Sequence, residues 1–111
     1  MGYRLNRKLV LEMPARLPDG AGGFSESWMP LGTLWAEVIA RAGREAAGLA
    51  APISRVGYKI IVRAAPQTSQ ARPQPNQRFR EGERLYRILA VAEDDQDGRY
   101  LTCTAQEETV A

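Results

Sequence analysis

The chain contains no histidine and only one cysteine among its 111 residues. Cys103 therefore has no partner for an internal disulfide, and a conventional zinc site cannot be assembled. Histidine base catalysis is excluded for the same reason. The phosphate-binding G-x-x-x-x-G-K-[ST], dinucleotide-binding G-x-G-x-x-G and nucleophile G-x-S-x-G motifs are also absent from the sequence. We therefore expect a protein that is not an enzyme and that needs neither a metal ion nor a cofactor.

Long apolar runs are missing as well. No stretch approaches the 18 apolar residues of a membrane-spanning helix, and the first fourteen residues lack the apolar core of a secretory signal. We expect a protein that is made in the cytoplasm and does not enter a membrane. A chain of this length predicts a single domain over residues 1–111, with one modest core and a binding surface rather than a deep cleft.

The charge is unevenly distributed, although its net value is only +2. It is +4 over Met1–Arg63, +3 over Ala64–Arg87 and −5 over Ile88–Ala111. Such asymmetry indicates a basic nucleic-acid face beside an acidic end, or complementary surfaces through which copies or partners stack. An unevenly charged, solvated surface explains it equally well.

Alternation of apolar and polar residues predicts strands in most of the chain. It occurs in Arg7–Pro14, where Pro14 is expected to end an edge strand, and in four later segments: Thr33–Arg41, Arg55–Arg63, Arg84–Glu93 and Arg99–Glu107. Turn signals at Asp19–Gly23 and at Asp97–Gly98 predict two hairpins. The predicted fold is a mainly all-β, small antiparallel barrel of about five or six strands. Its expected core contains Leu9, Leu34, Val38, Val56, Tyr58, Ile60, Val62, Ile88 and Leu101.

Two long segments interrupt the strand pattern. Ala42–Pro52 is rich in alanine and predicts a short helix or helical turn that Pro52 ends. Ala65–Gln77 holds three prolines and almost no large apolar residues, which predicts an extended, mobile loop or one that a partner orders. Function in a small barrel is commonly carried by such excursions.

Two local features could imitate reactive sites. The acids Glu93, Asp94, Asp95 and Asp97 depart from the spacing of a calcium loop and lie in a predicted hairpin turn, so we expect no metal site there. Cys103 shares its alternating face with Leu101 and Ala105, which predicts a small buried apolar residue rather than a nucleophile.

One basic stretch favours nucleic-acid binding. Arg78–Arg87 interleaves four arginines with Phe79 and Tyr86, a combination by which small barrels hold single strands. Glu81 and Glu83 lie in the same stretch and reduce its charge. A monomeric barrel that binds single-stranded nucleic acid is therefore the alternative hypothesis for this chain.

Several fragments taken in order resemble the phage head–tail joining proteins, also called head-closure or stopper proteins of the tailed-phage neck. The resemblance runs from about Leu5 to Cys103. Its fragments are Glu12-Met13-Pro14, Gly22-Gly23 with Trp28, Trp35-Ala36-Glu37-Val38, Gly43-Arg44-Glu45, and Gly82 with Tyr86 and Ile88. The Pro- and Gln-rich segment Pro66–Gln77 is longer than the family pattern. Gene transfer agents also use such neck proteins, and the sequence does not separate the two settings.

The resemblance implies a structural protein assembled in the host cytoplasm into the neck of a virion or gene-transfer-agent particle. Copies would form a homo-oligomeric ring, a hexamer or a dodecamer, between a portal-bound adaptor protein and a tail terminator or tail tube protein. The ring would close the head and retain packaged double-stranded DNA in its channel.

Six residues are predicted to lie at subunit interfaces: Trp28, Trp35, Glu37, Arg72, Asp94 and Asp95. Trp35 lies opposite the apolar face of its strand, where an aromatic side chain suits an interface anchor. Alternatively, Trp35 covers a second small core beneath Ala42–Pro52. The acidic hairpin at Glu93–Asp97 is expected to meet a basic surface on a neighbour.

Arg41–Arg55 is predicted to be the segment that reaches the channel. Arg41, Arg44 and Arg55, with Glu45 beside them, could contact phosphates without reading sequence, and small residues between them would let copies crowd around an axis. Ala65–Gln77 is then expected to extend along a neighbouring subunit. The reverse assignment, with Ala65–Gln77 in the channel and Arg41–Arg55 along the neighbour, stays open. The alternative is a purely structural role, in which a short helix over Ala42–Pro52 closes one end of the barrel.

Overall fold

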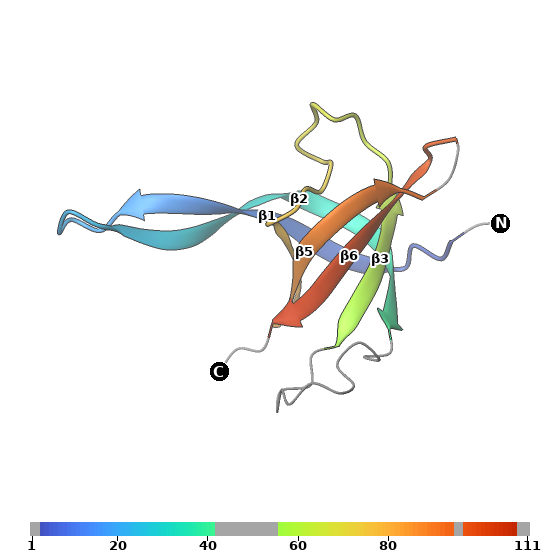
Figure 1. Cartoon of the computed structure of the whole chain (residues 1–111), viewed down its shortest axis with the longest axis horizontal. Helices are drawn as coiled ribbons and strands as arrows, with labels where there is room; N and C mark the ends of the chain where they lie inside the picture. Colours follow the sequence, from blue (N-terminus) through green and yellow to red (C-terminus); the bar gives the residue numbers. More distant parts are fainter. Residues whose placement is uncertain (1–2, 42–55, 95–96, 109–111) are drawn as a thin grey trace.

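Six strands build the molecule, as the computed structural model in Figure 1 shows; it describes residues 3–41, 56–94 and 97–108. They are β1 (Arg7–Pro18), β2 (Phe24–Arg41), β3 (Gly57–Arg63), β4 (Arg78–Glu81), β5 (Arg84–Glu93) and β6 (Tyr100–Glu108). All pairings are antiparallel, and the strands close into a barrel in the order β1-β2-β3-β6-β5-β4. The predicted antiparallel barrel is therefore confirmed. The described residues contain no helix, and hence none that could span a membrane; the helix predicted at Ala42–Pro52 lies outside them.

The core consists of the inward side chains that alternation predicts, together with several more. Leu9, Ile60, Val62, Ile88 and Leu101 are fully buried, while Leu34, Val38 and Tyr58 are partly buried against them. The prediction for Val56 is wrong, because this residue precedes β3 and is 41% exposed. The larger contributors that the prediction omitted are Leu11, Phe79 and Tyr86. Cys103 is buried as expected, and burial raises the pKa of its thiol to about 12.

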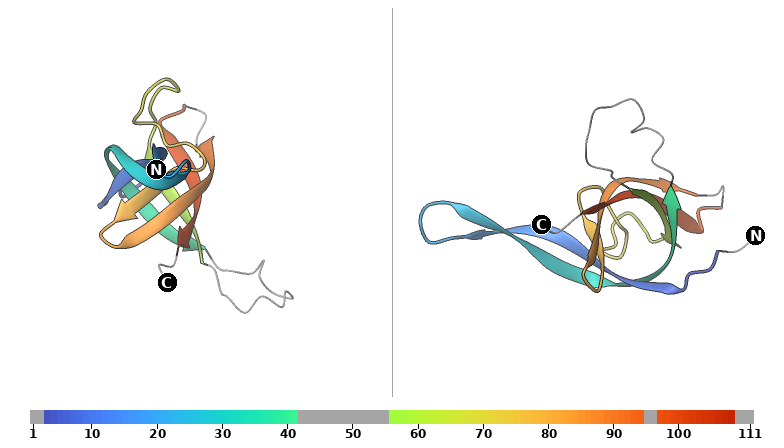
Figure 2. Two further views of the ribbon diagram at one scale, coloured as in Figure 1. Left: turned by 90° about the vertical axis from the view of Figure 1, so that its left-hand side faces the viewer. Right: turned by 90° about the horizontal axis from the view of Figure 1, so that it is seen from below.

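The first two strands continue beyond the barrel as a two-stranded arm. Pro14 does not end β1; the strand continues to Pro18, pairing with β2 along its whole length. Figures 1 and 2 show this hairpin projecting from the barrel, with its tip as the most distant point of the molecule. The tip is fixed by Asp19, whose Oδ1 accepts hydrogen bonds from the backbone N–H groups of Ala21 (2.8 Å) and Gly23 (3.1 Å). Gly20 and Gly22 have φ values of 82° and 85°, which other residues adopt at a cost.

A short seam closes the barrel between β1 and β4. Val10 to Glu12 pair with Arg80 to Arg78, and a bulge between Leu11 and Glu12 shifts the β1–β2 register at the same place. The bulge marks the point where β1 leaves the barrel and enters the arm. Such irregularities bend and twist a strand, which allows the hairpin to depart from the barrel wall.

The N-terminal segment crosses the outside of the barrel. The backbone N–H of Arg4 donates to Glu37 Oε1 on β2 (2.7 Å), and the Tyr3 hydroxyl donates to the Asp94 carboxylate at the end of β5. The Tyr3 and Tyr100 rings meet edge to face, 5.1 Å between centroids. Ile61 lies on β3 between the inward residues Ile60 and Val62, and is fully buried without belonging to the core cluster. The outer face of the barrel is therefore also covered at Ile61.

The connection between β3 and β4 differs from its prediction. Ala65–Gln77 is not extended: it contains three turns, Pro73 is fully buried, and Asn76 has a φ of 74°. The Asn76 N–H donates to Ile88 O and the Ile88 N–H donates to Gln77 O, both at 2.9 Å. These bonds dock the end of the loop on β5 within a single chain, so no partner is needed to order it. The other predicted hairpin, at Asp97–Gly98, is confirmed between β5 and β6.

Candidate assembly surfaces

The base of the arm is held to the barrel by a nearly buried carboxylate. Glu12 is 5% exposed, and its two oxygens accept hydrogen bonds from Arg78 Nε (2.7 Å) and Arg80 Nε (2.8 Å). Burial acts to raise the pKa of Glu12, but the bonds from Arg80 and Arg78 outweigh it and hold the pKa below its usual value. Glu12 is therefore a charged clasp between β1 and β4.

Trp28, a predicted interface residue, packs against Arg78 and against Arg87. The guanidinium of Arg78 lies 4.0 Å from the centre of its ring, and that of Arg87 lies 5.2 Å away. Trp28 is half-buried by these contacts. The sequence analysis missed this cation–π cluster, because the residues that form it are distant in sequence. Its contacts within the chain fix the arm and leave only part of the ring for a neighbour.

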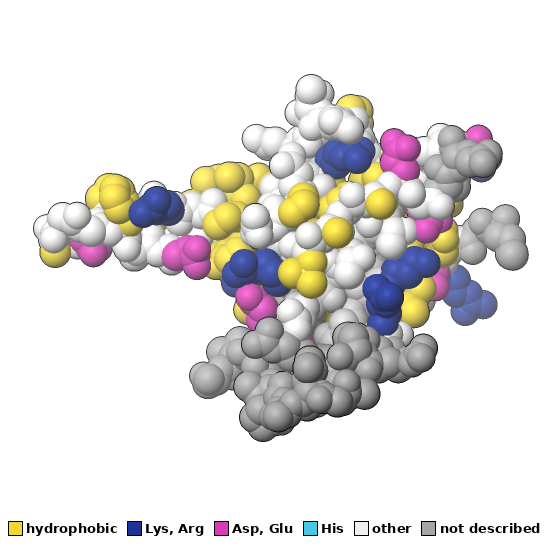
Figure 3. All heavy atoms as spheres, viewed as in Figure 1, with side chains coloured by type: hydrophobic (Ala, Val, Ile, Leu, Met, Phe, Trp, Pro, Cys, Tyr) yellow, Lys and Arg dark blue, Asp and Glu magenta, His cyan; other side chains and the backbone are white. Residues whose placement is uncertain are grey.

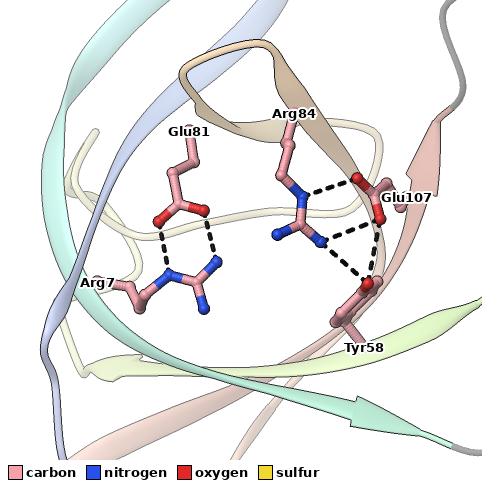
Figure 4. Close-up of polar contacts among 5 residues, drawn as sticks. All are labelled: Arg7, Tyr58, Glu81, Arg84 and Glu107. Carbon is pink, nitrogen blue, oxygen red and sulfur yellow. Dashed lines mark hydrogen bonds and ion pairs between the residues drawn. The ribbon is translucent and has the colours of Figure 1, made fainter.

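A second group of ion pairs surrounds one end of the barrel (Figure 4). Arg7 and Glu81 form a two-bond contact at 2.5 and 2.6 Å, and Arg84 Nε donates to Glu107 Oε2 at 2.9 Å. Tyr58 accepts a bond from Arg84 Nη2 and donates one to Glu107 Oε1. Burial, and then the bond to Glu107, raise the pKa of the Tyr58 hydroxyl. This end of the barrel thus carries two polar groups, Arg7 with Glu81 and Arg84 with Glu107 and Tyr58.

These contacts bear on the single-strand hypothesis. Each arginine of Arg78–Arg87 is paired with an acid: Arg78 and Arg80 with Glu12, Arg84 with Glu107, and Arg87 with Glu108. Phe79 and Tyr86 are fully buried, so neither ring offers a face on which a base could stack. The described surface therefore lacks the two features on which this hypothesis rests.

The other predicted interface residues that the structure describes lie on β2, in the β3–β4 loop and just after β5, and two of them, Glu37 and Asp94, contact the N-terminal segment. Trp35 is 54% exposed on the outer face of β2, and Glu37, two residues further on the same strand, accepts the Arg4 bond described above. Arg72 lies in the β3–β4 loop, where its Nη1 donates to Ala65 O at 3.0 Å. Because Trp35 remains half exposed, it stays available as an interface residue.

Asp94 is engaged within the chain. It accepts hydrogen bonds from Thr102 Oγ1 and from the Tyr3 hydroxyl, and these bonds lower the pKa of its carboxyl. A charge reversal at Asp94 would therefore disturb the N-terminal segment as well as any contact with a neighbour. Asp95 lies outside the described residues, as do three members of the predicted gate, Arg44, Glu45 and Arg55. Arg41, the fourth, is exposed at the end of β2.

The arm is the surface that sequence reasoning missed. It presents Leu17 (52% exposed), Phe24 (60%) and Met29 (50%), half of the exposed large apolar residues of the described chain. A signal was present: prolines recur at Pro14, Pro18 and Pro30, as they do on strands with an open edge. Among the described residues, no group of His, Cys, Asp and Glu could hold a metal ion.

Comparison with known proteins agrees with this architecture. A chain from a structure described as the virion of a native gene transfer agent particle is 54% identical, with a TM-score of 0.81, and the match covers 99% of this chain and 100% of that one. The solution structure of protein SF1141 from Shigella flexneri 2a is 19% identical with a TM-score of 0.69, covers 97% and 96% of the two chains, and supports the fold alone. No curated protein sequence matches the chain. A family model described as phage head completion protein matches residues 2–108. The chain therefore belongs to the phage head completion protein family.

Proposed function

We propose that copies of this chain form a ring in the neck of a gene-transfer-agent or tailed-phage particle, where they close the head and retain packaged DNA. Membership in the head completion family supports a structural, non-catalytic role in such a particle. The observation that carries the proposal is the 54% identity, over essentially the whole of both chains, with a chain of a native gene transfer agent virion. That similarity favours the gene-transfer-agent setting.

The ring would lie between the portal-bound adaptor and the first protein of the tail. The uneven charge of the chain, +7 over residues 1–87 and −5 over residues 88–111, suits a component that meets different neighbours on different surfaces. A hexamer or dodecamer would match the rotational symmetry of a neck, and a heterologous contact between identical copies closes into such a ring.

The connection between β2 and β3 is the proposed channel gate. Arg41 pairs with Gly57 across the two strands, so a tight turn would suffice to join them. Residues 42–55 supply far more chain than that turn requires, and they include Arg44, Glu45 and Arg55. Extra length at the end of a rigid barrel is typical of functional loops. Its arginines suit contact with the DNA backbone.

Particles in which Gly43–Ala51 is replaced by a tight turn test the gate. They are expected to package DNA and then lose it, which is measured as nuclease-protected DNA in purified particles. A matched variant, R41Q/R44Q/R55Q, keeps the length of the loop and removes its positive charge, so it separates reach from phosphate contact. Full DNA retention by the shortened variant, with a ring visible in images of the neck, would remove the gate role and leave the ring.

A further inference from the structure

The arm has two chemically different faces. Opposed residues of β1 and β2 share a face, so the register places these residues on one side: Pro14, Arg16, Pro18, Phe24, Glu26 and Trp28. That side carries the charges of the paired strands beyond Glu12, and its Trp28 is held by Arg78. The other side, which we call the uncharged arm face, consists of Met13, Ala15, Leu17, Ser25, Ser27 and Met29.

The uncharged arm face is a continuation of the core face. Leu9 and Leu11 fill the barrel and are at most 1% exposed, and the same alternation along β1 continues through Met13 and Ala15 to Leu17. Beyond the seam with β4, no strand of the described chain lies opposite these residues. Exposure therefore rises along β1 to 52% at Leu17, and Met29, the β2 partner of Met13, is 50% exposed. The arm therefore exposes apolar side chains of the kind found in the core, because no described strand of the barrel covers them.

The open edges of the arm are blocked against strand addition. Pro14 and Pro18 on β1 and Pro30 on β2 have no N–H group, and edge strands place proline with that side toward solvent. An additional strand would therefore lack a hydrogen-bond donor at these positions on both edges of the arm. The arm is suited to contact through its side chains.

The barrel carries a matching uncharged surface. At the bulge in β5, Leu89 is 54% exposed, and Ala90 and Ala92 follow on the outer side of the strand; we call these three residues the β5 strip. Their partners on β6 are the uncharged residues Thr104 and Thr102, and the nearest charges beyond them are Lys59, which pairs with Thr104, and Asp94, which accepts a bond from Thr102. Figure 3 shows hydrophobic side chains over the middle of this face, with Lys and Arg on either side. Small side chains at Ala90 and Ala92 leave room for bulky ones from another molecule.

We propose that the uncharged arm face of one copy packs on the β5 strip of a second copy of this chain. The lack of charge on both surfaces is unfavourable for DNA or an anionic membrane and favours an apolar protein contact. Two different surfaces of one chain make a head-to-tail contact, which closes into a ring when its rotation allows. The proposal rests on the proposed ring and specifies the contact that builds it. Methionine at Met13 and Met29 lets the arm adapt to its partner surface.

Thiol cross-linking in intact particles tests the contact. The pair L17C/A90C places a cysteine on each surface, while the native Cys103 is buried and protonated. A short thiol cross-linker is expected to give a ladder of covalent multimers of this chain. The control R16C/A90C moves the arm cysteine by one residue to the charged face and is expected to give none. A cross-link from L17C to a different neck protein would overturn the assignment of a second copy as the partner.

Loss of the apolar side chains provides an independent test. L17S/M29S is expected to weaken the association of copies by about tenfold for each residue, while circular dichroism still shows the barrel. The matched variant R16Q/E26Q alters the opposite face and is expected to enter particles at the wild-type level. Images of wild-type necks that lack a ring of this chain would refute the ring and the contact together. If wild-type necks contain the ring and L17S/M29S necks contain it at the same occupancy, the proposed contact is refuted and the ring is retained.

Discussion

Replacement of Glu12 by glutamine tests whether the clasp at the base of the arm holds the barrel closed. The change keeps the shape of the side chain and removes its charge. Arg78, whose side chain is 15% exposed, then loses its counter-charge, whereas Arg80 is 41% exposed and stays hydrated. Breaking a buried pair costs about 3–5 kcal/mol, and because only one of the two arginines is well buried we expect about 2–3 kcal/mol. In a domain of this size that lowers the melting temperature by about 10–15 °C.

The pH dependence of stability provides a second measurement on the same variant. The pKa of Glu12 is lower in the folded protein than in the unfolded chain. The ionised Glu12 side chain therefore adds to the free energy of unfolding at every pH above the unfolded pKa. This contribution is lost as the pH falls through the folded pKa. E12Q should therefore lose stability near neutral pH and approach the wild type in acid. Urea unfolding, which leaves ion pairs unscreened, measures both effects.

The control for this experiment is E26Q. Glu26 is exposed and lies opposite Arg16 on the arm, where an ion pair adds little, so its loss should change the free energy of unfolding by less than about 1 kcal/mol. A free energy of unfolding for E12Q as close to the wild type as that of E26Q would refute the clasp. So would an equal loss of stability for E12Q at neutral and acid pH.

Two further predictions concern the far side of the barrel and its interior. D94N should lower the free energy of unfolding by about 1–2 kcal/mol, because it weakens the bonds from Thr102 and Tyr3. D97N, at an exposed residue, is the control. Equal urea midpoints for the two variants would argue against a role for the N-terminal segment in stability. Cys103, with a pKa of about 12, should remain unlabelled by a thiol reagent at pH 8 in the native protein and react once urea unfolds it. Rapid labelling of the native protein would show that the barrel opens at β6.

Strand alternation predicted much of the fold because it reflects a local rule. A strand that covers a core must place its apolar residues on one side, and Ile60, Val62 and Leu101 follow this rule closely. The rule does not state where a strand begins, so Val56 was included although it precedes β3. It also does not state where a barrel ends, and the continuation of β1 past Pro14 into an arm was therefore missed.

Contacts between distant segments were beyond the sequence analysis. Glu12 meets Arg78 across 66 residues, and nothing near either residue specifies the other. The basic stretch Arg78–Arg87 consequently had the composition of a nucleic-acid surface, whereas its charges are paired and its rings buried. The burial of Pro73 was hidden for the same reason, since composition alone makes its loop look solvated. Family resemblance succeeded where local rules failed, because the order of short fragments reflects the whole fold.

The seam between β1 and β4 also has a consequence for how the chain folds. β1 and β2 are neighbours in sequence and can zip together from the turn at Asp19, at a small cost in loop entropy. The seam joins Val10–Glu12 to Arg78–Arg80, so its partners are available only after β4 has been synthesised. Closure of the barrel is thus a late event that depends on three residue pairs. Until it occurs, the nascent β1–β2 hairpin exposes Leu9 and Leu11 along with the arm, in a single apolar strip.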